Sequence, residues 1–250
     1  MLISVLIIDD DDSARNILRN FLSTDERIFI IDSLSGTNGA LELIESEEPD
    51  AIFLDINMPE EDGLEFASRL KMASVQPKVI FTTAYSHYAF DAFGLKPFYF
   101  LTKPFGIIDI HNLIDNIAEK IEFEERKQSE IVHAEMSIHG KLKLQSRNGY
   151  LFVEPKSIIL INSVLNHSEY LDSDGNYVTL YGKLIDIEPF LKYFNFIRIN
   201  RSILANIIYI NRVDRKQKIC ILRNCSEEYE FHISRTAIKK LENINSIKLG

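Results

Sequence analysis

The chain has 250 residues, a comfortable length for two domains, because single domains mostly run to about 100–150 residues. With 46% hydrophobic and 26% charged residues it has the composition of an ordinary globular protein, which excludes a largely disordered chain. The formal net charge of −9, taken alone, argues against a nucleic-acid binder.

This average hides a difference between the two halves of the chain. Residues 1–125 hold 24 acidic and 9 basic residues, a balance of −15, whereas residues 126–250 hold 13 acidic and 19 basic residues, a balance of +6. The asymmetry predicts an acidic module joined to one that meets a polyanion.

In the first half, short apolar runs alternate with amphipathic helical patterns. The runs are typical of buried parallel strands and lie at Leu2–Ile8, Phe29–Leu34, Ala51–Leu54, Lys78–Phe81 and Phe98–Leu101. The helical patterns, the first with Ser13 as its N-cap, lie at Ser13–Leu22, Thr37–Ser46, Asp62–Met72, Tyr85–Phe93 and Ile107–Glu125. Five strands in strict alternation with five helices predict a doubly wound α/β domain, in which chemistry gathers beyond the carboxyl ends of the strands.

Beyond this half the pattern becomes mainly β. Residues 123–136 predict a helical extension or linker between a domain at 1–122 and one at 137–246. Turn signals separate strand-like runs at Lys141–Leu144, Tyr150–Val153, Ser157–Ile161, Tyr177–Tyr181, Ile203–Ile210, Lys218–Leu222 and Tyr229–Ile233. Only two segments predict helices, Lys183–Tyr193 and Ser234–Asn243.

The apolar runs and the cysteines bear on cellular location. No apolar run approaches the ~20 residues of a membrane span, and the first residues lack the charged-then-apolar order of a signal peptide. Cys220 and Cys225 are too few for a disulfide framework or a structural zinc site, so we expect reduced thiols. These features predict a cytoplasmic protein with no membrane partner.

Polar residues follow the predicted strands of the first half where each strand ends. Asp9 and Asp10 follow the first strand. Asp55 ends the third, and Lys103 follows the fifth. Carboxylates that converge on one edge repel one another unless a hard cation such as Mg²⁺, which prefers oxygen ligands, lies between them. With a hydroxyl at Thr83 and the lysine ammonium to hold an oxyanion, the set predicts the formation of an aspartyl phosphate.

These pieces resemble the receiver domain of bacterial two-component response regulators, a CheY-like, flavodoxin-like fold, over about residues 1–122. The matching motifs are V-L-I-I-D-D at 5–10, F-L-D-I-N-M-P at 53–59, D-G at 62–63, T-A at 83–84 and K-P-F at 103–105. The resemblance implies a regulator rather than an enzyme, with a sensor histidine kinase as phosphoryl donor, Mg²⁺ as cofactor and a homodimer on phosphorylation.

Carried over position by position, the resemblance assigns the metal and phosphoryl sites. It implies that Asp55 accepts the phosphoryl group and ligates the metal. Asp10 would be a direct ligand, Asp9 would act mainly through water, and Asn57 would contribute its backbone carbonyl.

The resemblance also implies a switch. Thr83 and the Ala84 amide would hold phosphoryl oxygens with Lys103 as their counter-charge, and the bond before Pro104 would be cis. Phe100 matches the aromatic switch position, with an ordinary half-buried strand residue as the alternative. Four further aromatic residues are expected at a phosphorylation-dependent dimer face, or else in ordinary packing: Tyr85, Phe93, Phe98 and Tyr99.

The second half resembles the LytTR DNA-binding domain over about residues 140–245. The matching motifs are D-G-N-Y-V at 174–178, F-I-R-I-N-R-S-I-L-A-N at 196–206 and S-R at 234–235. The resemblance implies a β-scaffold whose loops enter successive major grooves of promoter DNA and bend the duplex. Two departures are a segment 181–190 shorter than usual, which predicts a truncated or missing strand, and Asn200 where histidine is frequent.

The DNA contacts carry over by position as well. The residues expected at or near base edges are Asn176, Arg201 and Arg235. The candidates for phosphate contacts, which give affinity without sequence information, are Arg198, Asn200, Arg215, Lys216 and Lys218. Two alternatives stay open: residues 215–218 as a solvated hairpin tip, and Arg198 in a structural salt bridge with Glu169 or Glu188.

Two other functions compete with a phosphorylation-controlled transcription factor. One is a phospho-regulated interaction module whose β-domain binds a protein rather than DNA; the balance of +6 and the Arg201/Arg235 pair favour DNA. The other is a Mg²⁺ phosphohydrolase that uses Asp55 as nucleophile. Such enzymes commonly carry a second acid two residues after the nucleophile, and Asn57 occupies that position.

Overall fold

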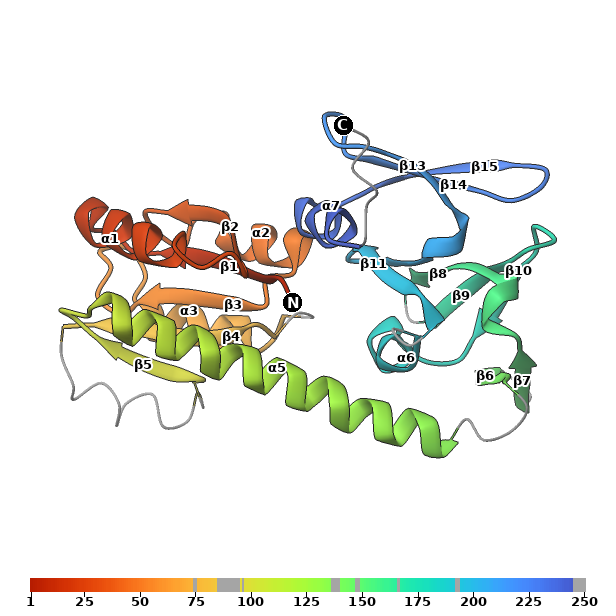
Figure 1. Cartoon of the computed structure of the whole chain (residues 1–250), viewed down its shortest axis with the longest axis horizontal. Helices are drawn as coiled ribbons and strands as arrows, with labels where there is room; N and C mark the ends of the chain where they lie inside the picture. The colour runs from red at the N-terminus through yellow and green to blue at the C-terminus, as the bar shows by residue number, and fades with distance from the viewer. Residues whose placement is uncertain are drawn as a thin grey trace. The chain divides into compact units, whose positions relative to one another are not determined.

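The computed structural model describes residues 1–73, 76–84, 95, 97–135, 140–146, 149–165, 167–191 and 194–244, with side chains omitted at 125–135 and 189. The predicted helix Tyr85–Phe93 lies outside these residues. The chain divides into two compact units, Met1–Lys120 and Ile121–Glu242, and each is described by itself (Figure 1). The predicted domain limits at 122 and 137 stay a prediction.

The first unit is built on one parallel sheet of five strands, in the order β2-β1-β3-β4-β5. The strands are β1 (Ile3–Ile8), β2 (Ile28–Leu34), β3 (Ala51–Asp55), β4 (Lys78–Thr83) and β5 (Tyr99–Thr102). The described helices are α1 (Asp12–Leu22), α2 (Ala40–Glu47), α3 (Gly63–Leu70) and α5 (Ile107–Glu135). This strand order is the flavodoxin-like one, and it confirms the predicted fold class.

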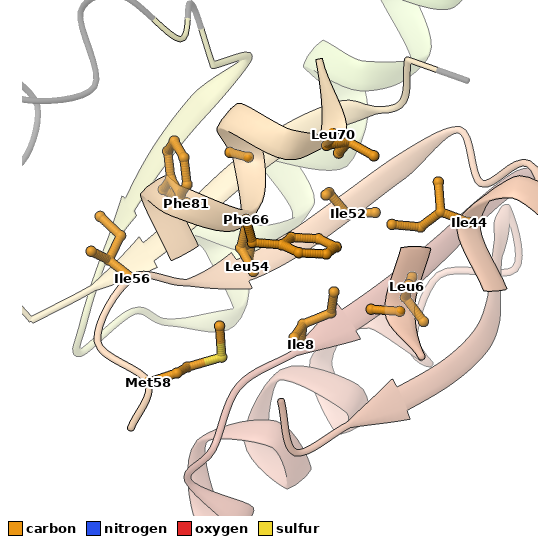
Figure 2. Packing of buried hydrophobic residues seen from close by; sticks show 12 residues of the cluster. Leu6, Ile8, Ile44, Ile52, Leu54, Ile56, Met58, Phe66, Leu70 and Phe81 are labelled. Atoms are coloured by element: carbon orange, nitrogen blue, oxygen red, sulfur yellow. The ribbon is translucent and has the colours of Figure 1, made fainter. Parts of the chain in front are cut away.

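Buried side chains hold the helices to both faces of this sheet. On one face, β1 and β3 pack Leu6, Ile8, Ile52 and Leu54 against Phe66 and Leu70 of α3 and Ile44 of α2 (Figure 2). Because alternate strand residues point to opposite faces, the neighbouring apolar residues of β1 and β3 line the other face. The inner sides of α1 and α5 are likewise buried, at Leu18, Leu22, Ile110 and Ile114. Because both faces are covered, apolar residues predominate in these strands, and β1 and β3 are buried along their whole length.

Several helix ends differ from their predicted positions, and two of these differences are informative. Asp11, not Ser13, is the N-cap of α1, because its carboxylate accepts the Ser13 and Ala14 amides. An aspartate caps at least as well as a serine, and the run of acids offered several candidates. Helix α5 extends to Glu135, ten residues beyond the predicted Glu125, and so covers most of the helical extension expected at 123–136.

The second unit is mainly antiparallel β. Its strands form a five-stranded sheet, β10-β9-β8-β12-β11, a three-stranded sheet, β13-β14-β15, and the hairpin β6-β7. The first sheet comprises β8 (Ile158–Val164), β9 (His167–Asp172), β10 (Tyr177–Leu180), β11 (Phe196–Asn200) and β12 (Ile203–Asn206). The remaining elements are β6 (Leu142–Ser146), β7 (Gly149–Val153), β13 (Ile210–Asp214), β14 (Ile219–Arg223), β15 (Glu228–His232), α6 (Leu184–Leu191), α7 (Arg235–Glu242) and two short 3₁₀ helices, η2 (Pro155–Ser157) and η4 (Ile207–Tyr209).

The strand predictions in this unit were wrong in two respects. The run Ile203–Ile210 is not one strand, because η4 separates β12 from β13. Strands β9, β11 and β13 were missed, since they carry polar residues such as Glu169, Arg198 and Arg212 that dilute the apolar signal. β10 ends at Leu180 and α6 begins at Leu184, and a truncated or missing strand at 181–190 stays a prediction.

Two buried clusters stabilise this unit. One joins the sheets to α7, with Cys220 and Leu222 of β14 packed against Ala237 and Ile238. The other joins the β6-β7 hairpin to the first sheet and α6, through residues such as Leu142. Helix α7 and its preceding loop are therefore fixed to the sheets by apolar burial, which sets the position of the residues at its N-terminus.

Candidate functional site

Three carboxylates from two strand ends lie together at the carboxyl edge of the parallel sheet. Asp9 and Asp10 follow β1, Asp55 ends β3, and one oxygen atom of each lies within 4.8 Å of the others. Asp9 and Asp55 are only 2% and 5% exposed, whereas Asp10 is exposed. Strand order reverses between β1 and β3, the position at which open α/β sheets bind ligands.

Lys103 closes this pocket from the end of β5. Its Nζ donates to Oδ2 of Asp9 and to Oδ1 of Asp55, at 2.7 Å each. The Lys103–Pro104 peptide bond is cis, as the resemblance implied. One ammonium therefore partly neutralises two buried acids from different strands.

The surroundings in the pocket shift the pKa values of Asp55 and Lys103. Burial raises the pKa of Asp55 above its ordinary value, and the hydrogen bond from Lys103 offsets part of that rise. Burial by itself would lower the pKa of Lys103, but its hydrogen bonds to Asp55 and Asp9 outweigh burial and raise it. Lys103 therefore stays a cation at neutral pH and provides a fixed positive charge beside Asp55.

The neighbouring loops complete the edge of the pocket. Thr83, the last residue of β4, is buried, and its carbonyl accepts the Lys103 amide at 2.7 Å. Ala84 follows it and is exposed. Asn57 is exposed in the loop after β3, and its backbone amide donates to the Asp55 carboxylate. The structure thus places all of the predicted pocket residues at this one sheet edge.

Gly63 makes a close approach behind Asp55. Its amide donates to the Ile56 carbonyl at 2.8 Å. A Cβ atom at this position would lie 2.2 Å from the backbone oxygen of Asp55, so only glycine fits without moving that backbone. The preceding Asp62 caps α3 by accepting the Glu65 amide at 2.8 Å. The D-G motif therefore supports the position of Asp55.

Sequence reasoning missed Arg15, which lies against the pocket from α1. Its Nη1 donates to the backbone oxygen of Asp9 at 2.5 Å, and its guanidinium also pairs with Asp12. The available signal was a basic residue three positions after an exposed acid, a spacing that places both on one side of a helix. Arg15 fixes the loop that carries Asp9 and Asp10.

Phe100, the predicted switch residue, is half-buried on β5. Its ring centroid lies 5.5 Å from that of Phe81, at an interplanar angle of 31°, and the ring packs against the cluster shown in Figure 2. Phe98 is also half-buried and Tyr99 is 44% exposed. Tyr85 and Phe93, the other members of the predicted dimer face, lie outside the described residues.

In the second unit, two of the predicted DNA-contacting arginines lie beside one backbone junction. Arg201 is exposed in the two-residue turn between β11 and β12, and Arg235 begins α7. The Ser234 amide, directly before α7, donates to the Ile199 carbonyl of β11 at 2.8 Å. The fold therefore brings together two arginines that are 34 positions apart in the chain.

The β13-β14 turn contacts the last residue of α7 through Arg215 and the segment before α7 through Lys218. Arg215 is exposed, and its Nη1 pairs with Glu242 at 2.9 Å. Lys216 is exposed, and the carbonyl of Lys218, which has φ of 53°, accepts the Ile233 amide at 2.9 Å. The turn is an exposed hairpin tip, and it is attached to the element that begins with Arg235.

Asn176 lies in the β9-β10 turn, which contacts the tip of the β14-β15 hairpin that is far from Arg201 and Arg235. Its Nδ2 is 3.3 and 3.4 Å from the two carboxylate oxygens of Asp172, within the β9-β10 turn. That turn contacts the far tip of the hairpin, where Asn224 Nδ2 donates to the Ser173 carbonyl at 3.4 Å. Five residues of β14, at about 3.3 Å each, separate this tip from the arginines by about 17 Å.

Arg198 and Asn200 make polar contacts inside the unit. Arg198 Nη1 pairs with Glu188 at 2.6 Å, so of the two salt-bridge partners considered the structure shows Glu188. The side chain of Asn200 bonds to the backbone of Ser202 and of His232. Both residues therefore support the Arg201 turn from within.

The parallel sheet with its acidic pocket defines the class of protein, a response regulator with a receiver domain. Comparison with family models agrees: residues 5–115 match the response regulator receiver domain and residues 148–245 match the LytTr DNA-binding domain. The chain belongs to the two-component response regulators that carry a LytTR DNA-binding domain.

The chain is also similar to curated relatives and to a solved structure. The chain is 28% identical over 246 residues to the sensory transduction protein LytT of Bacillus subtilis, covering 97% of this chain and 99% of that protein. It is 26% identical over 249 residues to the sensory transduction protein LytR of Staphylococcus saprophyticus, covering 96% and 97%. The response regulatory domain of protein mrkE from Klebsiella pneumoniae matches 48% of this chain and 98% of its own, with 29% identity and a TM-score of 0.45. Within the described part of the chain, no helix is both long and apolar enough to cross a membrane.

Proposed function

We propose that the first domain accepts a phosphoryl group on Asp55 from a phosphohistidine of a sensor kinase. In this transfer the N–P bond of the phosphohistidine breaks, and a bond forms between phosphorus and a carboxylate oxygen of Asp55. The observation that carries the proposal is the pocket itself, with three carboxylates within 4.8 Å and Lys103 at 2.7 Å from two of them. Lys103 then stabilises the charge that develops on the phosphoryl oxygens.

The donor set fits Mg²⁺. Carboxylate and carbonyl oxygens are the ligands this hard cation prefers, and Asp9, Asp10, Asp55 and the Asn57 carbonyl supply them. Bound there, Mg²⁺ would screen the acids and the incoming phosphoryl group from each other.

The same proposal includes a conformational output. A phosphoryl group on Asp55 adds negative charge. Thr83, the Ala84 amide and Lys103 would rearrange to contact its oxygens. Phe100, packed on Phe81 of β4, would transmit this change to the surface and shift the receiver toward a homodimer. The receiver, linker and output domain are proposed at 1–122, 123–136 and 137–246, in a cytoplasmic protein.

The second domain, in this proposal, binds promoter DNA. Arg201 and Arg235 would contact base edges from neighbouring loops, with Asn176 at or near a separate contact. The β13-β14 turn residues Lys216 and Lys218, and Arg215 beside them, would contact phosphates. An exposed arginine on a turn, as at Arg201, and one at the start of a helix, as at Arg235, suit this task, because arginine pairs bidentately with guanine in the major groove.

Phosphoryl acceptance is tested with acetyl phosphate and Mg²⁺. Wild-type protein should become labelled at one site, and Asp55→Asn should abolish labelling because its amide is not a nucleophile. Asp115→Asn, an exposed acid of α5 in the same unit, is the matched control and should label normally. Labelling of the Asp55→Asn protein at a neighbouring acid would refute the assignment.

DNA binding is tested by selecting duplexes from a random pool with full-length protein. We expect a specific duplex whose affinity falls as salt rises, since phosphate contacts release counterions. Absence of salt-dependent duplex binding would favour the rival function, a β-domain that binds a protein. Steady turnover of a phosphate ester would instead revive the phosphohydrolase.

A further inference from the structure

The β11-β12 turn, which carries Arg201, is held by more than strand pairing. The register shifts between Arg198 and Asn200, so the strand pair alone leaves the turn irregular. The carbonyl of Ser202, the second turn residue, accepts the Ser163 amide of β8 at 2.7 Å. The backbone on one side of Arg201 is therefore fixed to the neighbouring strand.

Arg198 fixes the carbonyl of Arg201 itself. Its Nη2 donates to that oxygen at 2.5 Å, and its Nη1 pairs with Glu188 of α6 at 2.6 Å. The side chains of Arg198 and Glu188 are only 18% and 17% exposed, so salt screens this pair less than an exposed one. The turn is thereby connected to α6.

Asn200 connects the turn to the segment before α7. Its Oδ1 accepts the Ser202 amide at 2.9 Å, and its Nδ2 donates to the carbonyl of His232 at 2.8 Å. The oxygen of this one amide side chain thus bonds the residue after Arg201, and its nitrogen bonds the end of β15.

The segment it reaches leads directly to Arg235. Ser234 caps α7, since its hydroxyl accepts the Ala237 amide at 3.1 Å. Its own amide donates to the carbonyl of Ile199, the neighbour of Asn200, at 2.8 Å. Two hydrogen bonds from adjacent residues of β11 therefore fix the backbone that begins α7, and both arginines extend from this junction.

We propose that Asn200 is a positioning residue, which holds Arg201 and Arg235 in a fixed relation so that both meet one duplex, rather than a residue that contacts DNA itself. This inference rests on the proposed DNA binding. Holding two contact residues in their bound arrangement raises affinity because less conformational freedom is lost on binding. Arg198 with Glu188 supports the same turn from α6.

The test compares Asn200→Ala in two backgrounds, measuring affinity for the selected duplex. In otherwise native protein we expect about fivefold weaker binding, the fold-change of one ordinary hydrogen bond. In the Arg201→Ala/Arg235→Ala protein we expect no further loss, because Asn200 acts through those residues. Asn211→Ala, an exposed asparagine of β13, is the matched control and should bind normally.

The outcomes separate this inference from the function on which it rests. Equal losses in both backgrounds would show that Asn200 contacts DNA directly and would overturn the inference. If the Arg201→Ala/Arg235→Ala protein binds as tightly as the native one, the proposed DNA-binding face itself fails.

Amide hydrogen exchange tests the positioning without DNA. Asn200→Ala should speed exchange at Ser202, which loses its acceptor, whereas Asn200→Asp keeps that acceptor and should preserve protection there. Unchanged exchange at Ser202 in Asn200→Ala would contradict the inference, and an unfolding midpoint close to native shows that the variant is folded.

Discussion

The two domains use charge in opposite ways. In the receiver, Asp9 and Asp55 are almost completely buried and share one ammonium. In the output domain, Arg201 is exposed on a turn, and Arg215 is 73% exposed even though it is paired. Buried charge acts strongly over short distances on a small ion, whereas exposed charge is screened by salt and acts on an extended polyanion.

This difference teaches how one chain with a net charge of −9 can serve both functions. The acids that dominate the average include the residues proposed to bind Mg²⁺, and they gather at one sheet edge. The bases lie on turns of a separate fold. The comparison predicts that the two activities respond to different perturbations.

The largest expected effect is removal of Mg²⁺. Chelation at constant ionic strength should abolish phosphoryl acceptance, because the carboxylates of the pocket then repel the donor phosphate. DNA binding by unphosphorylated protein should be unchanged. Labelling with acetyl phosphate and a duplex-binding assay on the same sample check both, and labelling that persists in excess chelator would contradict the metal site.

A core substitution should affect one unit alone. Phe66→Ala removes a fully buried ring beside β1 and β3 and should lower the free energy of unfolding of the first unit by about 3–5 kcal/mol. Leu222→Ala is the counterpart in the second unit, with an expected loss of about 2–5 kcal/mol there. Amide hydrogen exchange measures the unfolding free energy of each unit separately. Equal loosening of both units by either change would show that they unfold together.

The proposed reading arginines should have intermediate effects. Arg201→Ala and Arg235→Ala should each weaken specific binding by about 1–3 kcal/mol, the value of a lost bidentate contact to a base. Phosphoryl labelling should be normal in both. Arg19→Ala, an exposed arginine of α1, is the charge-matched control. Unchanged footprints in both variants would refute the reading face.

The smallest expected effect is at the hairpin tip. Lys216→Ala should reduce the slope of log affinity against log salt by about 1, with little change in sequence preference, if this lysine contacts a phosphate. Measuring binding over a series of salt concentrations checks this. An unchanged slope would identify residues 215–218 as a solvated tip.

The receiver could be predicted closely because its signals are local. Each strand contains a short apolar run, and acidic residues follow β1 and end β3, so the five parallel strands were confirmed to within two residues at each end. What the sequence could not show is which partners meet. That Lys103 contacts Asp9 as well as Asp55 depends on the sheet order, and that Arg15 reaches Asp9 depends on a side-chain conformation.

The output domain was less predictable because its strands face solvent on one side. The pattern of β9, His167–Asp172, alternates buried and half-exposed residues with polar groups outward, which weakens a signal based on apolar runs. The alternatives for Arg198 stayed open for a similar reason, since only the fold brings α6 beside β11. Motifs located the arginines, but the hydrogen bonds between their loops required the structure.

The central claim is that phosphorylation of Asp55 controls DNA binding by the other domain. The most direct measurement is the affinity of full-length protein for its selected duplex before and after treatment with acetyl phosphate and Mg²⁺, with Asp55→Asn beside it. We expect treatment to tighten duplex binding by about 5–150-fold, as is usual for coupled sites, and to leave the affinity of the Asp55→Asn protein unchanged. Equal affinity before and after treatment, in protein shown to be phosphorylated, would contradict it.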